Sequence, residues 1–131
     1  MSESANHVRL VDRIVIWLNN RHSDKPTLCI FRDGDFVGLT ARPPIVNHFI
    51  PDVFAEDTPP TLTAIGEAKT SADLETKRSQ IQIRAFIEFL SICPNSQLII
   101  ATPPAALNTV RQIVQLAQLE LNARHVEAIF L

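Results

Sequence analysis

Two acidic residues and one lysine stand at a spacing that could support metal-dependent chemistry. Asp52 follows a proline, and the run Glu67-Ala68-Lys69 comes after the intervening segment 53–66. Side chains alternate between the two faces of a strand, so Glu67 and Lys69 would point the same way and Ala68 the opposite way. Residues 62–66 are apolar or small, and charges at the end of such a strand are costly if they are buried without partners.

If Asp52 lies on a neighbouring strand, two carboxylates and a lysine converge at one place. Carboxylate oxygens together with water suit Mg²⁺. A lysine can hold or polarise an attacking water and can steady charge on a phosphate oxygen. Hydrolysis of a phosphodiester needs this set of parts. The competing interpretation is a plain structural ion pair between Glu67 and Lys69.

The elements that must position these residues predict an α/β fold. Helices are predicted over 7–21, 74–91 and 104–122, the first capped by Asn6 and the second by Asp73. Strands are predicted over 27–32, 35–40, 45–55, 61–69, 97–101 and 125–131, with a hairpin turn at Asp33-Gly34. The order α-β-β-β-β-α-β-α-β describes a mixed β-sheet flanked by helices, with parallel pairing across the crossover helices. Residues 1–6 are polar and are expected to be disordered.

Pro51-Asp52 followed by Glu67-Ala68-Lys69 resembles the motif of the PD-(D/E)XK nuclease superfamily, which includes restriction endonucleases and Holliday-junction resolvases. The α-β-β-β-α-β core of that superfamily matches the predicted order over 7–101. The resemblance implies a restriction-endonuclease-like fold. It also implies that Asp52, Glu67 and the backbone carbonyl of Ala68 bind Mg²⁺ or Mn²⁺, and that Lys69 assists the water.

The resemblance implies two further site residues. Many members carry an acid on the first helix, and Asp12 is the candidate here. Several place a catalytic glutamine on the helix after the motif. Gln80 is preferred to Gln82, because by helical spacing it shares a side with Ile83 and Ile87. The four histidines show no ligand spacing.

The predicted function is that of a metal-dependent deoxyribonuclease, resolvase- or repair-like, that hydrolyses DNA. The helix 74–91 is apolar on two sides, so its second cover could be another helix or a second subunit. We therefore expect a homodimer or a partner protein that supplies recognition. The main alternative is a catalytically inactive nuclease-fold module for DNA or protein binding. A weaker alternative, a flavodoxin-like or nucleotide-binding module, lacks a glycine-rich phosphate loop.

Composition places limits on these functions. The 131 residues are 46% apolar and 20% charged, as expected for one domain spanning 1–131. The net charge of −2 weighs against non-specific nucleic-acid binding unless charge is segregated onto one face. No signal peptide and no membrane-length apolar run is evident, so a cytoplasmic location is expected. Cys29 and Cys93 are expected to be reduced core cysteines.

Overall fold

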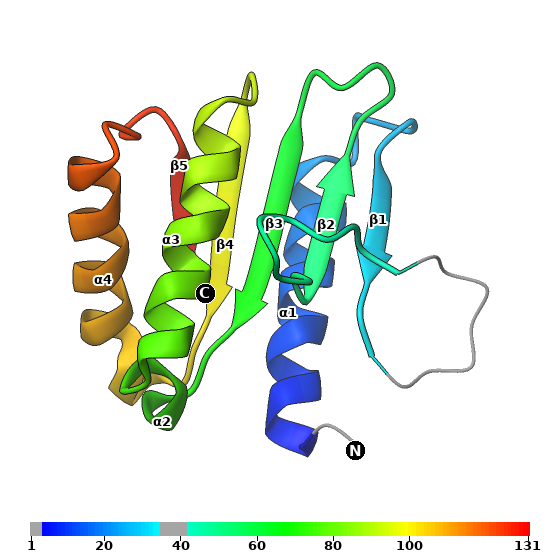
Figure 1. Cartoon of the computed structure of the whole chain (residues 1–131). Coiled ribbons are helices and arrows are strands. Elements are labelled where there is room, and N and C mark those ends of the chain that lie inside the picture. Colours follow the sequence, from blue (N-terminus) through cyan, green and yellow to red (C-terminus); the bar gives the residue numbers. More distant parts are fainter. Residues whose placement is uncertain (1–3, 35–41) are drawn as a thin grey trace.

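The computed structural model describes residues 4–34 and 42–131, and within them five strands form one mixed sheet in the order β1-β2-β3-β4-β5 (Figure 1). β1 (Cys29–Arg32), β2 (Val53–Glu56) and β3 (Thr63–Ala68) pair antiparallel. β4 (Ser96–Ala101) and β5 (Glu127–Phe130) continue the sheet in parallel. The predicted α/β class, with a mixed sheet and parallel pairing in the second half of the chain, is confirmed.

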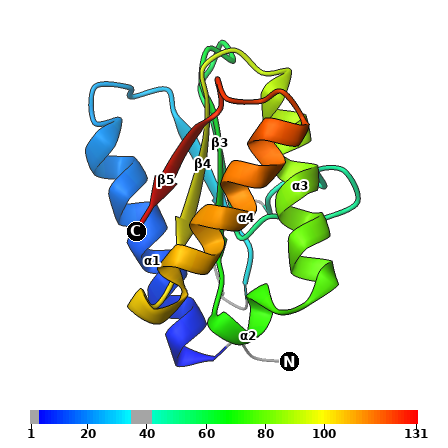
Figure 2. The same cartoon turned by 90° about the vertical axis from the view of Figure 1, so that its left-hand side faces the viewer.

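Helices cover both faces of this sheet (Figure 2). α1 (Ala5–Arg21) lies on one face, whereas α3 (Lys77–Ser91) and α4 (Leu107–Glu120) lie on the other. A short helix, α2 (Ser71–Leu74), links β3 to α3, and a 3₁₀ turn, η1 (Pro104–Ala106), precedes α4. Each large aliphatic side chain that these helices bury contributes about 1.5–3 kcal/mol to folding. α4 packs beside Gln80 and Arg84 of α3. The second apolar side predicted for this helix is covered only in part: Phe89 contacts Phe54, whereas Ile81 is 56% exposed.

α1 packs directly on Gly66 of β3. A Cβ atom added at Gly66 would lie 2.5 Å from Cγ2 of Ile14 and 3.2 Å from Cβ of Val53. All three residues lie in the interior, and Ile14 and Val53 are fully buried. Glycine at this position therefore sets how near α1 lies to the sheet, and hence where the first turns of α1 sit relative to the end of β3.

The long helix predicted over 74–91 is broken into α2 and α3. Thr70 caps α2 by accepting from the backbone N–H of Asp73, and the Asp73 side chain accepts from the backbone N–H of Thr70. Thr76 then caps α3 by accepting from the N–H of Ser79. The prediction of Asp73 as the cap was therefore wrong. Two threonines that satisfy free N–H groups at successive turns favour two helix starts over one.

Three other local predictions need correction. Ser4, not Asn6, caps α1, so the expectation of disorder was wrong for residues 4–6. The strand predicted over 45–55 is regular only from Val53, because Asn47 and His48 have positive φ in a turn that Val46 and Phe49 close. The strand predicted over 35–40 lies outside the described residues.

The two cysteines are both free thiols, but neither is fully buried. Cys29 is exposed on β1 and Cys93 is half-buried after α3. The expectation that both are core residues was wrong, because β1 is an edge strand and leaves this side chain uncovered. In the described part of the chain, no helix is long and apolar enough to cross a membrane.

Candidate active site

Asp52 and Glu67 meet because β2 and β3 run antiparallel. The register pairs Val53 with Gly66, so Asp52 falls opposite Glu67. Each carboxylate is held by a backbone N–H of the other segment: Asp52 N–H donates to Oε1 of Glu67 over 3.0 Å, and Ala68 N–H donates to Oδ2 of Asp52 over 2.9 Å. This reciprocal arrangement fixes both acids at the sheet end where β3 stops.

Lys69 occupies the next position that faces the same way as Glu67. Its Nζ lies 3.4 Å from Oε2 of Glu67 and 3.4 Å from Oγ of Ser79, and it also donates to Oε1 of Gln82. The backbone N–H of Lys69 donates to the carbonyl of Ala101, which anchors the residue to the end of β4. The side chain is buried, yet its ammonium group donates two hydrogen bonds and forms one ion pair. Its ammonium group is therefore held in place beside the two acids.

A further residue at this site, His7 of α1, was missed by the sequence reasoning. Its Nε2 lies 3.4 Å from Oδ1 of Asp52. His7 is far from Asp52 in the sequence and reaches it because α1 crosses the sheet at Gly66. Ser79, which also holds Lys69, was missed because nothing in its spacing to the motif marks it. Gln82, the other residue that holds Lys69, had been set aside in favour of Gln80.

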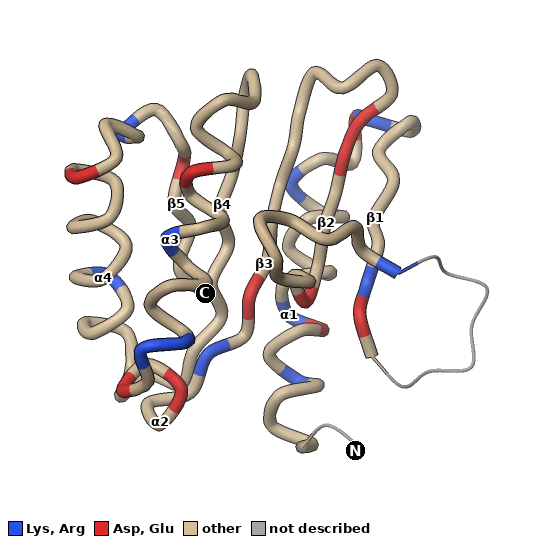
Figure 3. Tube along the Cα trace, in the orientation of Figure 1, with Lys and Arg blue, Asp and Glu red and all other residues tan. Residues whose placement is uncertain are grey.

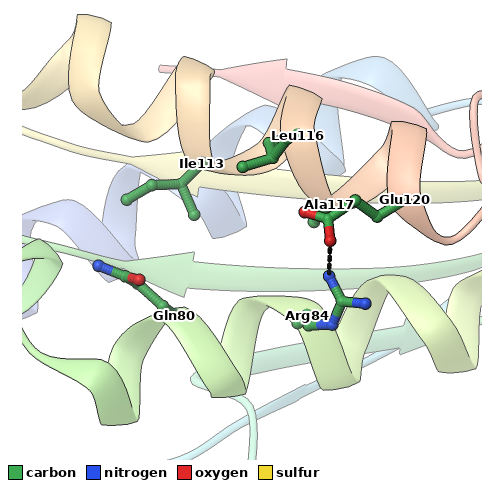
Figure 4. A pocket seen from close by; sticks show the side chains of 6 residues that line it. All are labelled: Gln80, Arg84, Ile113, Leu116, Ala117 and Glu120. Atoms are coloured by element: carbon green, nitrogen blue, oxygen red, sulfur yellow. Dashed lines mark ion pairs between the residues drawn. The ribbon is translucent and has the colours of Figure 1, made fainter.

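Two other residues predicted for the site make their recorded side-chain contacts with groups other than Asp52, Glu67 and Lys69. Asp12 forms an ion pair with Nη1 of Arg32, which joins α1 to β1. Gln80 donates to the carbonyl of Leu74 over 3.3 Å and lines a small groove between α3 and α4, beside the ion pair of Arg84 with Glu120 (Figure 4). It is Gln82 that reaches Lys69.

The error over the glutamines has a physical reason. α3 buries one side against the sheet and presents the adjoining side to α4. Ile87 lies near the boundary between these two sides. A residue on the same side as Ile87 can therefore face α4, as Gln80 does, and need not face the sheet. Ser79 and Gln82, three residues apart, lie together on the side toward Lys69.

The carboxyl group of Glu67 is in an unfavourable electrostatic position. It is 2% exposed, and this burial raises its pKa well above the ordinary value near 4.5. The negative charge of Asp52 raises the pKa further, whereas the Lys69 ammonium opposes the rise. The net effect is that two acids share a site where ionising both is unfavourable. A positive charge added between them would relieve that repulsion.

The raised pKa of Glu67 predicts a specific pH dependence of stability. As pH rises above about 4.5, the unfolded chain releases this proton while the folded chain retains it, so the free energy of unfolding falls until the folded pKa is passed. Glu67→Gln carries no such proton, and we expect a flatter dependence. Urea unfolding in a chelating buffer from about pH 5 to about pH 8 measures this. Glu88→Gln, an exposed change on α3, should follow wild type. Parallel curves for all three proteins would contradict the prediction.

The residues present fit a divalent cation with few protein ligands. Within residues 4–34 and 42–131, no three His, Cys, Asp or Glu side chains form a group that could hold a metal. The donors at the sheet end are instead two carboxylates, Asp52 and Glu67, together with the backbone beside them. Mg²⁺ is usually bound in this way, through one or two carboxylates, with water and substrate oxygens completing its coordination. An ionised carboxylate offers about four lone-pair sites, so both acids keep acceptor capacity beyond the hydrogen bonds described above.

The arrangement brings two carboxylates and a buried ammonium group together at one end of the sheet. Comparison of the chain with protein-family models, with curated proteins and with solved structures finds no match. Any inference about its function therefore rests on the residues that meet at this end of the sheet.

Proposed function

We propose that this chain is a Mg²⁺- or Mn²⁺-dependent deoxyribonuclease with a restriction-endonuclease-like fold. The observation that carries the proposal is the joining of Asp52 and Glu67 by reciprocal backbone hydrogen bonds, with the Lys69 ammonium 3.4 Å from Glu67. The order of β1, β2, β3, α3 and β4 after α1 also agrees with the α-β-β-β-α-β core expected for that superfamily.

In the proposed hydrolysis, each residue of the site has a separate role. Asp52 and Glu67 supply the anionic ligands, and the Ala68 carbonyl is the further ligand that the motif implies. When bound, the cation supplies Lewis-acid stabilisation of phosphate charge and a more acidic water. Lys69, fixed by Ser79 and Gln82, is placed to orient the attacking water and to stabilise negative charge that develops on the phosphate.

A metal titration tests the proposal directly. We expect Mn²⁺ to stabilise the wild-type chain by about 2.7 kcal/mol at 100 times its Kd, a rise of several degrees in Tm. Asp52→Asn keeps an acceptor for the Ala68 N–H but removes the charge, so this rise should be lost. Asp24→Asn, which changes an exposed acid after α1, should retain it. Tm is measured by scanning calorimetry with EDTA or with Mn²⁺.

A cleavage assay completes the test. Linear duplex, single-stranded and branched DNA are incubated with each variant and Mg²⁺ or Mn²⁺. Cleavage by wild type and Asp24→Asn, but not by Asp52→Asn, supports the proposal. No metal response in wild type, together with equal or greater stability of Asp52→Asn, would overturn it.

One observation favours a second candidate, the inactive nuclease-fold module. Lys69 is already satisfied by Glu67, Ser79 and Gln82, as a structural ion pair would be. In that case the Asp52 charge only repels Glu67, and removing it stabilises the chain. The sign of the change in Tm for Asp52→Asn without metal, read together with the Mn²⁺ response, separates the two candidates.

A further inference from the structure

A pocket of about 290 Å³ lies between α1 and the turns that follow β3 and β4. Its lining contains two arginines and, among the described residues, no acidic one: Asn6, Arg9, Leu10, Arg13, Thr70 and Pro103. The volume is at the lower end for ligand sites. A pocket of this size and charge suits a segment of an anionic chain better than a large organic cofactor.

The two arginines of this pocket are available to an external anion. Arg9 and Arg13 are both exposed, and neither forms an ion pair with any residue of 4–34 or 42–131. They lie four residues apart, so they are neighbours on the surface of α1 and repel each other by a few tenths of a kcal/mol. Asn6 lies in the first turn of α1, so the pocket also meets the positive end of the helix dipole. An anion in the pocket would offset this concentration of positive charge.

The backbone connects the pocket lining to the candidate active site at two points. His7, which contacts Asp52, lies in the chain between Asn6 and Arg9, and Thr70 directly follows Lys69. Figure 3 shows basic positions on the part of α1 nearest the N-terminus and at the start of α3, with acidic positions between them on α1, at the end of β3 and at α2. The positive charge is local to the pocket lining, because the chain as a whole carries a net charge of −2.

We propose that this pocket binds the phosphodiester backbone of a DNA strand, one segment away from the phosphate that is cleaved. The proposal rests on the proposed nuclease function and identifies where that substrate lies. In this arrangement the phosphate oxygens contact Arg9 and Arg13, and the sugar contacts Leu10 and Pro103. The pocket makes no contacts with the bases. Binding here is independent of sequence, because contacts to phosphate position a strand and carry no base information.

Binding is measured without metal, so that it is independent of cleavage. Anisotropy of a labelled single-stranded oligonucleotide is followed in EDTA over a range of salt concentrations. Arg9→Gln and Arg13→Gln should each weaken binding equally for different sequences and reduce the slope of log K against log salt by about 0.7. Arg21→Gln removes an exposed arginine at the other end of α1 and is the matched control, expected to bind as wild type does.

The outcomes separate this inference from the proposed function. The pocket assignment would be overturned if the Arg9→Gln, Arg13→Gln double variant bound DNA with the affinity and salt dependence of wild type. It would also be overturned if Arg21→Gln lost as much affinity as the pocket variants do. Binding of inorganic phosphate, measured by titration calorimetry and lost in the double variant, together with no DNA binding by wild type, would show a small-anion site and also overturn the assignment. DNA binding that depends on the two arginines, without cleavage under any metal, would support the pocket and refute the nuclease.

Discussion

Lys69→Met is expected to lower kcat for DNA cleavage by about 10²- to 10⁴-fold, the usual contribution of a positioned proton-transfer group. The methionine fills a similar volume, so the buried site should stay packed. Lys69 contributes its charge and its donors, and neither Ser79 nor Gln82 can replace them at the position next to Glu67.

The same substitution should leave metal binding intact. Asp52 and Glu67 remain, and the Lys69 ammonium no longer competes with the metal for Glu67. The Mn²⁺-dependent rise in Tm should therefore persist or increase. Lys77→Met, an exposed change at the first residue of α3, is the control and should keep kcat at saturating DNA. Equal kcat for Lys69→Met and wild type would show that Lys69 has no role in the mechanism, whether or not the Mn²⁺-dependent rise in Tm persists.

Gly66→Ala is expected to destabilise the chain by about 1–3 kcal/mol, the range for overpacking a filled interior. The added methyl group would lie 2.5 Å from Cγ2 of Ile14, a branch close to the helix backbone that cannot swing aside. This loss outweighs the gain of about 0.4–1 kcal/mol that alanine brings by restricting the unfolded chain. Urea unfolding measures the difference.

A double-mutant cycle tests whether the contact with Ile14 is the cause. Ile14→Ala alone should cost about 2–5 kcal/mol, because it leaves a cavity under α1. In the double variant, the methyl group added at position 66 occupies part of that cavity, so the combined loss should be smaller than the sum by about 1 kcal/mol or more. Additive losses would show that Gly66 matters for another reason, such as the local strand backbone. A reduced Mn²⁺ response in Gly66→Ala would further show that the position of α1 affects the site.

The sequence was sufficient to predict the parts of the site that depend on local geometry. Alternation along β3 places Glu67 and Lys69 on one side, and antiparallel pairing with β2 brings Asp52 opposite Glu67. The helices and most strands follow from hydrophobic spacing in the same way. Their bounds do not, since threonine caps and positive-φ turns break elements where the apolar pattern continues.

The parts that depend on how elements cross could not be predicted from spacing. His7 reaches Asp52 only because α1 crosses β3 where glycine permits close approach. Gln82 rather than Gln80 reaches Lys69 because α3 divides its surface between the sheet and α4. Both outcomes depend on interhelical and helix–sheet angles, which arise from packing among residues distant in the chain. The role of each residue in catalysis stays a prediction.

The position of α1 has a consequence for the chain as the ribosome makes it. α1 is synthesised before every strand of the described sheet, yet its main contacts are with β3 and β4. At 5–20 residues per second, the roughly 80 residues from the end of α1 to the end of β4 take about 4–16 s to appear. Throughout that interval the apolar stripe of Leu10, Val11, Ile14 and Leu18 lacks the complete sheet that covers it in the folded chain. The nascent chain should therefore bind a chaperone through its first helix and release it once β4 has emerged.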